Sequence, residues 1–222
     1  MKRVKDKQDK IDPNKPYRFF QWGPFLYKTE IPEYILKRLL KDGKELKESY
    51  NHKLAGHLDN QFLFSPETQA WFYKEINPIL DQYRNAHCKY HRLQELPVNF
   101  VYDDLWVNYM KAGDFNPLHT HGGDYSFVLF LDVPKILQKE MTGFKGTSSE
   151  PAALTFEYGV QQRPPNKWAT TGTVVYPKTG DFYMFPALLQ HWVAPFKSKC
   201  TRISVSGNIR MLNKEDLPRD YF

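Results

Sequence analysis

Two of the seven histidines in the chain, His119 and His121, stand two positions apart in the segment NPLHTHGGDYSFVLFLDVP (residues 116–134), just before an apolar run typical of a β-strand. Alternate residues of an extended chain point to the same side, so the two imidazoles can converge on one point. Imidazole nitrogens bind transition metals such as iron, zinc and copper. The two histidines are therefore either part of a metal site or a pair of ordinary polar loop residues, and the spacing alone does not decide between these interpretations.

A third imidazole that could complete this site is His191, which follows the β-prone segment GDFYMFP. If the two strand ends are neighbours in a small barrel, three side-chain ligands meet at one mouth, and a metal there keeps open positions for a substrate. Two other pairs, His52 with His57 and His87 with His91, have no third ligand near them in the sequence. We interpret both pairs as structural or surface residues.

The segment TRISVSGNIR carries a further group of polar side chains. Its alternation separates an apolar face from a polar one. The polar face consists of Arg202, Ser204, Ser206 and Asn208. Such a face either meets water, as is common in antiparallel sheets, or lines a cavity in which Arg202 and Ser204 hold a carboxylate. The strand by itself favours neither interpretation.

Helical patterns come first in the chain, and strand patterns follow. Ile31, Ile35 and Leu39 have helical spacing in a segment that ends near Gly43, and a second helix begins at SPET, where Ser65 can cap it. From about residue 98 the expected strands are VNFVY, LWVNYM, SFVLFLDV, ALTFEY, TVVYP, GDFYMFP and TRISVSGNIR. This order predicts a mainly β protein with N-terminal helices that pack on an antiparallel sheet, sandwich or barrel.

The chain of 222 residues, 41% of them hydrophobic, is long enough for one large domain, which we place at residues 17–222. Residues 1–16 are charged and poor in apolar side chains, and we expect them to form a mobile tail. A turn-rich insertion over about residues 135–172 interrupts the strands. Insertions of this length are either functional loops or solvated excursions.

Composition argues against several other classes of protein. The net charge of +6 comes from 31 basic and 25 acidic residues without a basic stripe, which disfavours a dedicated nucleic-acid-binding protein. The cysteines, Cys88 and Cys200, are too few for a disulfide framework. The sequence contains neither a membrane-length apolar run nor an N-terminal signal segment. We therefore expect a cytoplasmic protein that does not bind membranes, located in a host's cytoplasm if the gene is phage-encoded.

The order HTH, SFVLFLDVP, PKTGDFYMFP, LLQHWVAPF and CTRISVSGN resembles the iron(II)- and 2-oxoglutarate-dependent oxygenases. More narrowly, it is similar to a subfamily with a His-x-His motif that is frequent in bacteria and marine bacteriophages. The resemblance covers about residues 98–210. It implies a double-stranded β-helix, which is a jelly-roll, cupin-like barrel with supporting helices. It also implies Fe(II), 2-oxoglutarate as cosubstrate and ascorbate as a stimulant.

The resemblance also implies roles for individual residues. His119 and His191 would bind iron, and the implied cosubstrate contacts are Arg202, Ser204, Asn108 and Tyr109. The usual ligand set in these enzymes is two histidines and one carboxylate, but here His121 stands where the Asp of His-x-Asp would be. We prefer His121 as the third ligand. Asp124 is the alternative, because the preceding GG is flexible enough to bring its carboxylate to the metal or to a ligating imidazole.

The implied activity is hydroxylation of an unidentified prime substrate, which would be a protein residue, a nucleic acid or a small molecule, with production of succinate and carbon dioxide. One alternative is a cupin-like three-His dioxygenase or isomerase that does not use 2-oxoglutarate, in which Arg202 is only structural. Another is a non-enzymatic β-sandwich binding module whose histidines never meet. The sequence does not indicate an oligomeric state.

Overall fold

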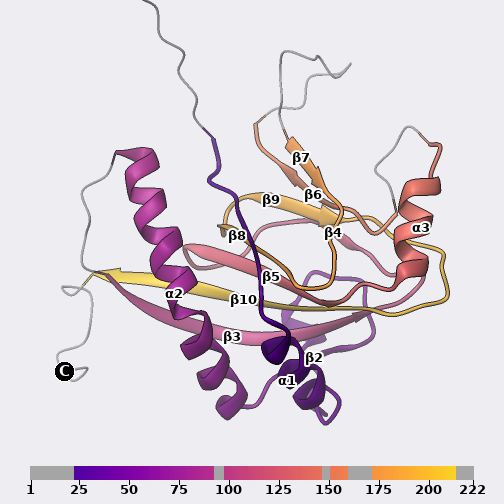
Figure 1. Cartoon of the computed structure of the whole chain (residues 1–222), viewed down its shortest axis with the longest axis horizontal. Helices are drawn as coiled ribbons and strands as arrows, with labels where there is room; N and C mark the ends of the chain where they lie inside the picture. Colours follow the sequence, from indigo (N-terminus) through magenta and orange to yellow (C-terminus); the bar gives the residue numbers. More distant parts are fainter. Residues whose placement is uncertain (1–22, 93–97, 147–150, 160–171, 214–222) are drawn as a thin grey trace, which may run out of the picture.

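A computed structural model describes residues 23–92, 98–146, 151–159 and 172–213 (Figure 1). The expected tail at residues 1–16 lies outside these ranges. Within them, strands dominate and two helices precede most of the strands, which confirms the expected mainly β protein with helices on its N-terminal side. No helix in the described part is both long and apolar enough to cross a membrane.

The first two helices lie where the sequence places them. Helix α1 spans Glu33–Gly43 and helix α2 spans Pro66–His91, and a single 3-10 turn at Asn51–Lys53 lies between them. Ser65 caps α2, because its hydroxyl accepts a hydrogen bond from the backbone N–H of Thr68 at 3.3 Å. The start of α2 therefore depends on a local signal in the sequence, whereas α1 follows Pro32 without a side-chain cap.

A third helix, α3 (Lys135–Gly143), occupies the start of the segment that we expected to be a turn-rich insertion. That expectation is wrong for these residues. Leu137 and Met141 are four positions apart and both are buried, so the segment has an apolar helical face. The sequence did not predict this helix, because the i, i+4 spacing is short and is followed by glycines and serines that are typical of turns.

The strands form two antiparallel sheets. The larger sheet has the order β1-β8-β5-β10-β3-β2, and the smaller sheet has the order β4-β9-β6-β7. The larger sheet contains β1 (Tyr27–Glu30), β2 (Gln61–Leu63), β3 (Val98–Met110), β5 (Tyr125–Asp132), β8 (Asp181–Pro186) and β10 (Arg202–Asn213). The smaller sheet contains β4 (Asn116–His119), β6 (Leu154–Glu157), β7 (Gly172–Val175) and β9 (Gln190–Val193).

Two features of these sheets differ from the expectation. The segments VNFVY and LWVNYM form one continuous strand, β3, because β10 pairs with it along nearly its whole length. Strands β4 and β9 were not expected at all, although they carry His119 and His191. Their four-residue segments, NPLH and QHWV, begin with polar residues or proline and contain no β-prone apolar run like those of the equally short β6 and β7.

From β3 to β10 the chain passes back and forth between the two sheets, except at β6 and β7, which pair within the smaller sheet. The two sheets face each other as layers of a flattened barrel (Figure 1). Helices α1 and α2 cover the outer face of the larger sheet, where their apolar residues share one core cluster with alternate residues of β3, β5, β8 and β10. A second cluster fills the space between the sheets. The inner face of the larger sheet is therefore buried, and a polar side chain on it points into the protein.

Candidate metal centre and cosubstrate pocket

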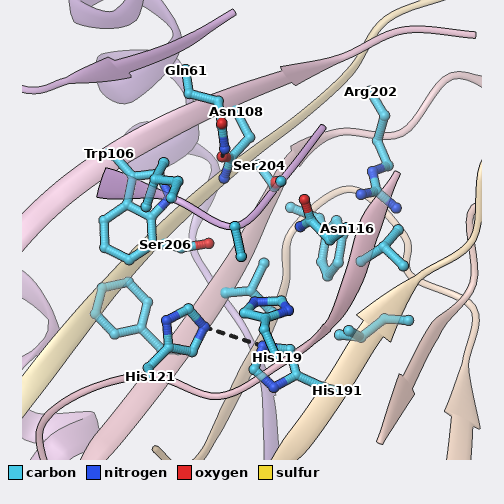
Figure 2. A pocket seen from close by; sticks show the side chains of 18 of the residues that line it. Gln61, Trp106, Asn108, Asn116, His119, His121, His191, Arg202, Ser204 and Ser206 are labelled. Atoms are coloured by element: carbon cyan, nitrogen blue, oxygen red, sulfur yellow. Dashed lines mark hydrogen bonds between the residues drawn. The ribbon is translucent and has the colours of Figure 1, made fainter. Parts of the chain in front are cut away.

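Three histidines that are far apart in the chain meet at one end of the space between the sheets (Figure 2). The ring centroids of His119 and His191 are 4.3 Å apart, and His121 lies 4.9 Å from His119 and 5.0 Å from His191. One nitrogen of each ring lies within 4.8 Å of the others, which makes the group suited to one metal ion. The interpretation in which these histidines never meet is therefore wrong.

Strand pairing brings two of these histidines together. His119 of β4 is the direct cross-strand partner of His191 of β9, so their side chains leave neighbouring backbones on the same face. His121 follows the end of β4, and its backbone N–H donates to the carbonyl oxygen of Ala187 at 2.9 Å. The local backbone therefore holds all three rings at one place.

A β-bulge shapes this end of the smaller sheet. Between the pairs Asn116–Val193 and His119–His191, strand β4 has one residue more than β9. In a regular strand, residues 116 and 119 would point to opposite faces. Because of the bulge, Asn116 and His119 both line the pocket.

The hydrogen bonds of two rings leave nitrogen lone pairs for a metal. The Nδ1 atoms of His119 and His191 lie 2.7 Å and 2.8 Å from the carbonyl oxygens of Pro117 and Leu189. Since a carbonyl oxygen only accepts, each Nδ1 carries the hydrogen and each Nε2 has a free lone pair. A hydrogen bond from the ring nitrogen that does not bind the metal is what normally fixes the tautomer of a metal-binding histidine.

The spacing of the nitrogens also fits a metal. The Nε2 atoms of His121 and His191 are 3.1 Å apart (Figure 2). Two imidazoles bound at right angles to one ion, with bonds of about 2.1 Å, have nitrogens about 3 Å apart. The three side chains present therefore fit a transition-metal ion such as iron, and they leave coordination positions open.

Burial keeps these imidazoles neutral. Desolvation is the main cause in each case: it lowers the pKa of His121 to about 3, with His191 and His119 adding to the shift, and lowers the pKa of His191 to about 4, with a smaller contribution from His119. The pKa of His119 is also lowered by burial. A metal binds only the neutral ring, so the site is ready for a cation at neutral pH.

The same shifts predict an acid-sensitive fold. In the unfolded chain these rings bind protons below about pH 6.5, whereas the folded protein keeps His121 and His191 neutral down to about pH 3 and 4. The unfolded state then binds more protons, so the free energy of unfolding of the metal-free protein should fall as pH drops from about 6.5 to 4 and stay flat above pH 7.

Guanidinium denaturation of metal-free protein at several pH values measures this slope. The variant His121→Asn lacks one of the titrating rings, so its free energy of unfolding should depend less steeply on pH below 6.5. An unchanged slope in this variant would contradict the assignment of the acid sensitivity to the histidine cluster.

Arg202, on β10, lies across the pocket from the histidines (Figure 2). Its side chain is buried, with 3% exposure, and among the described residues no ion pair includes it. Nη1 donates to the carbonyl oxygen of Ala152 at 2.9 Å and Nη2 to the sulfur of Met110 at 3.0 Å, while Nε has no hydrogen-bond partner in the described structure. Burial lowers the pKa of the guanidinium only to about 10, so it stays charged at neutral pH.

A buried cation without a counter-ion is unfavourable, which indicates that an anion normally lies beside it. Ser204 lies two residues farther along the same face of β10, is 4% exposed and also lines the pocket. Arg202, Ser204 and Ser206 on the polar face of β10 therefore line a cavity, whereas Asn208 accepts a hydrogen bond from the Ser126 hydroxyl. A carboxylate is an anion that a planar guanidinium binds with two parallel hydrogen bonds, and a neighbouring hydroxyl can donate a further one.

Of the two neighbouring residues on β3, the structure brings only one to this pocket. Asn108 lies on the inner face of β3, where its Oδ1 accepts a hydrogen bond from Nε2 of Gln61 at 2.7 Å. Tyr109 points to the opposite face, against Phe62 and α1, where a Cβ added at Gly43 would lie 2.9 Å from the Tyr109 hydroxyl. The expected cosubstrate contact of Tyr109 is therefore not supported, because neighbouring residues of a strand point to opposite sides.

Asp124 also lies away from the metal-competent group. Its carboxylate accepts a hydrogen bond from the backbone N–H of Met211 at 2.6 Å, and its backbone N–H donates to the carbonyl oxygen of Ile209 at 2.9 Å. These contacts fix the start of β5 against β10. The structure thus favours His121 over Asp124 as the third ligand.

Gln61, Trp106 and Asn116 are among the pocket residues that were not singled out from the sequence. Gln61 belongs to the three-residue strand β2, which pairs with β3 and places Gln61 opposite Asn108. Trp106 precedes Asn108 by two positions on the inner face of β3, so alternation could have identified it once β3 was known to be one strand. No local signal identifies Gln61 or Asn116.

The comparison with protein families agrees with this geometry. Residues 104–208 match the family model described as "Putative 2OG-Fe(II) oxygenase". The chain is therefore similar to the 2OG-Fe(II) oxygenases over these residues, as the resemblance in its motifs implied. The matched range begins six residues into β3, includes all three histidines and Arg202, and ends within β10. No curated protein sequence matches this chain significantly.

Solved structures show the fold of this chain. The viral collagen prolyl hydroxylase vCPH from Paramecium bursaria Chlorella virus-1, in complex with 2-oxoglutarate, is 16% identical with a TM-score of 0.52, over 84% of this chain and 96% of that one. A prolyl-4-hydroxylase from Pseudomonas putida is 16% identical with a TM-score of 0.51, over 83% and 91% of the two chains. HygX from Streptomyces hygroscopicus, with nickel and 2-oxoglutarate bound, is 9% identical with a TM-score of 0.52, over 83% and 82%. These similarities show the double-stranded β-helix fold.

Proposed function

We propose that this protein is an Fe(II)- and 2-oxoglutarate-dependent hydroxylase. His119, His121 and His191 would hold the iron, and Arg202 with Ser204 would hold the distal carboxylate of 2-oxoglutarate. The observation that carries the proposal is the buried Arg202 guanidinium, which has no anionic partner in the described structure and lies across the pocket from three neutral imidazoles. A dicarboxylate that chelates a metal at one end supplies the missing anion at the other.

When bound, Fe(II) and 2-oxoglutarate supply the oxidising chemistry, in which one atom of O₂ goes to the substrate C–H carbon and the other to succinate, with release of carbon dioxide. The chain itself supplies position and a dry environment. The carbonyl oxygens of Pro117 and Leu189 orient two ligand rings, and Arg202 fixes the far end of the cosubstrate. Phe130, whose ring lies 5.3 Å from the Arg202 guanidinium, keeps water away from that end.

The third imidazole changes the charge of the centre. Three neutral ligands leave the full charge of Fe(II) uncompensated by protein, whereas a carboxylate ligand would remove one unit. Together with Arg202, the pocket then attracts a dianion more strongly than a site with a carboxylate ligand would. We therefore expect 2-oxoglutarate, with its two carboxylates, to be favoured over a monocarboxylic keto acid.

Succinate production with Fe(II), 2-oxoglutarate, ascorbate and O₂ tests the proposal. The wild-type protein should release succinate slowly even without its prime substrate, while Arg202→Ala and His191→Ala should release none above background. Binding of 2-oxoglutarate to the metal-loaded protein, measured by calorimetry, serves as a readout that does not need turnover. Stoichiometric iron without any affinity for 2-oxoglutarate would instead favour the cupin-like three-His enzyme.

A further inference from the structure

Two carboxamides in the pocket each have a buried oxygen without a hydrogen-bond partner in the described structure. They are Gln61 Oε1 and Asn116 Oδ1. The side chain of Gln61 is 2% exposed, and its Nε2 donates to Asn108 Oδ1 at 2.7 Å, so this amide is oriented with its oxygen as the unused atom. A buried carbonyl-type oxygen without a donor is costly, so each one indicates a missing donor.

The side-chain amides of Gln61 and Asn116 both lie against the backbone of Gly56. A Cβ added at Gly56 would overlap Asn116 Oδ1 and lie 3.3 Å from Gln61 Nε2, so the Gly56 backbone lies against both side chains. Leu54, Ala55 and Gly56 also line the pocket. Trp106 forms a neighbouring wall, with its ring 6.1 Å from that of His121 (Figure 2). This part of the pocket is therefore a polar recess beside the metal ligands.

The cosubstrates cannot satisfy these two oxygens. At neutral pH 2-oxoglutarate is a dianion that only accepts hydrogen bonds, and O₂ has no hydrogen to donate. The donor is therefore either a water molecule or another molecule that displaces water when it enters the pocket. For an oxygenase with the proposed function, that molecule is the prime substrate.

The charge of the pocket restricts this donor. No Asp or Glu is among its lining residues in the described structure, and Arg202 already contributes a buried positive charge. An ammonium or guanidinium group would enter without a counter-ion. A phosphate or carboxylate has no donor for the amide oxygens at neutral pH. A neutral group with an N–H or O–H remains.

We propose that Gln61 and Asn116 form the prime-substrate recess and select a neutral amide or hydroxyl group that donates hydrogen bonds beside the oxidised carbon. This inference rests on the proposed function and deepens it, because it assigns a substrate chemistry to the same pocket. Gln61 and Asn116 are specificity-determining residues in this view. Gly56 keeps the recess open, because any side chain there would fill it.

Small probes test the recess on the full chain loaded with Ni(II) and 2-oxoglutarate. Propanamide and 1-propanol offer neutral donors, N,N-dimethylpropanamide has none, and propylammonium is a charged donor. Ligand-detected NMR should show binding of propanamide, propanol or both, and at least tenfold weaker binding of the dimethyl amide and the ammonium. The stronger of the two neutral probes identifies the prime substrate as an amide or an alcohol at this position.

Variants link the selectivity to the two amides. Gln61→Met and Asn116→Leu should weaken the neutral probe about tenfold or more while 2-oxoglutarate affinity changes less than threefold, and Gly56→Ala should do the same by filling the space. Gln61→Glu and Asn116→Asp keep the acceptors and add a charge, so they should shift the preference toward propylammonium. Gln82→Met is a matched control. Gln82 is an exposed residue of α2, away from the pocket, and its amide oxygen accepts a hydrogen bond from the Tyr27 hydroxyl at 2.9 Å.

Two results would overturn the recess. One is equal binding of propanamide and its dimethyl derivative. The other is a loss of 2-oxoglutarate affinity in Gln61→Met and Asn116→Leu with unchanged selectivity among the probes. That second result would mean that the two amides bind the cosubstrate. Failure of the proposed function looks different. In that case the wild-type protein does not bind 2-oxoglutarate, whereas Ni(II)-loaded protein alone still discriminates among the probes.

Discussion

Replacing Arg202 by methionine should raise the dissociation constant of 2-oxoglutarate by about 150- to 4,000-fold, because removing one partner of a buried charge pair costs about 3–5 kcal/mol. The stability of the protein without ligands should change far less. Methionine removes an unpaired buried charge, which offsets the lost hydrogen bond to the carbonyl oxygen of Ala152 at 2.9 Å. Calorimetry with metal-loaded protein and chemical denaturation of ligand-free protein measure the two quantities.

Arg210→Met is the matched control on the same strand. Arg210 forms an ion pair with Asp103 at 2.8 Å on the surface, where such pairs contribute little. Its replacement should leave the 2-oxoglutarate affinity unchanged. If Arg202→Met instead unfolded the protein and left residual affinity for 2-oxoglutarate intact, Arg202 would be a structural residue, as in the cupin-like alternative.

Replacing His191 by alanine should abolish stoichiometric metal binding and succinate production. His191 is the most buried of the three rings, at 5% exposure, and it contacts both of the others. The loss in metal affinity should exceed the 10- to 100-fold typical of a residue that only hydrogen-bonds a ligand. Metal analysis after anaerobic iron loading, with circular dichroism as a check on the fold, measures the result.

Residues 121 and 124 provide a sharper comparison at the same centre. His121→Asp restores the two-histidine, one-carboxylate ligand set common in iron oxygenases, so it should retain iron and bind 2-oxoglutarate more weakly because the centre loses one unit of positive charge. Asp124→Asn should keep full metal content, since the carboxylate of Asp124 accepts the Met211 N–H at 2.6 Å. Loss of iron in Asp124→Asn with full retention in His121→Ala would reverse the assignment.

The chemistry of the site could be predicted from the sequence, because it depends on residue types and on short periods. The i, i+2 spacing of His119 and His121 and the alternation of Arg202 with Ser204 follow from the geometry of an extended chain. The two helices before β3 also follow from local patterns, since the apolar face of each helix and the Ser65 cap of α2 are contained within single segments. The family resemblance added the pairing of iron with 2-oxoglutarate.

Only the tertiary structure decided which of these side chains meet. The register of β4 against β9 pairs His119 with His191, and a bulge in β4 turns Asn116 into the pocket. The pairing of β2 with β3 brings in Gln61. Register depends on which strands lie side by side, and residues tens of positions away in the chain set it. For the same reason the sequence alone could not show that Tyr109 faces the helices or that Asp124 binds the backbone of β10.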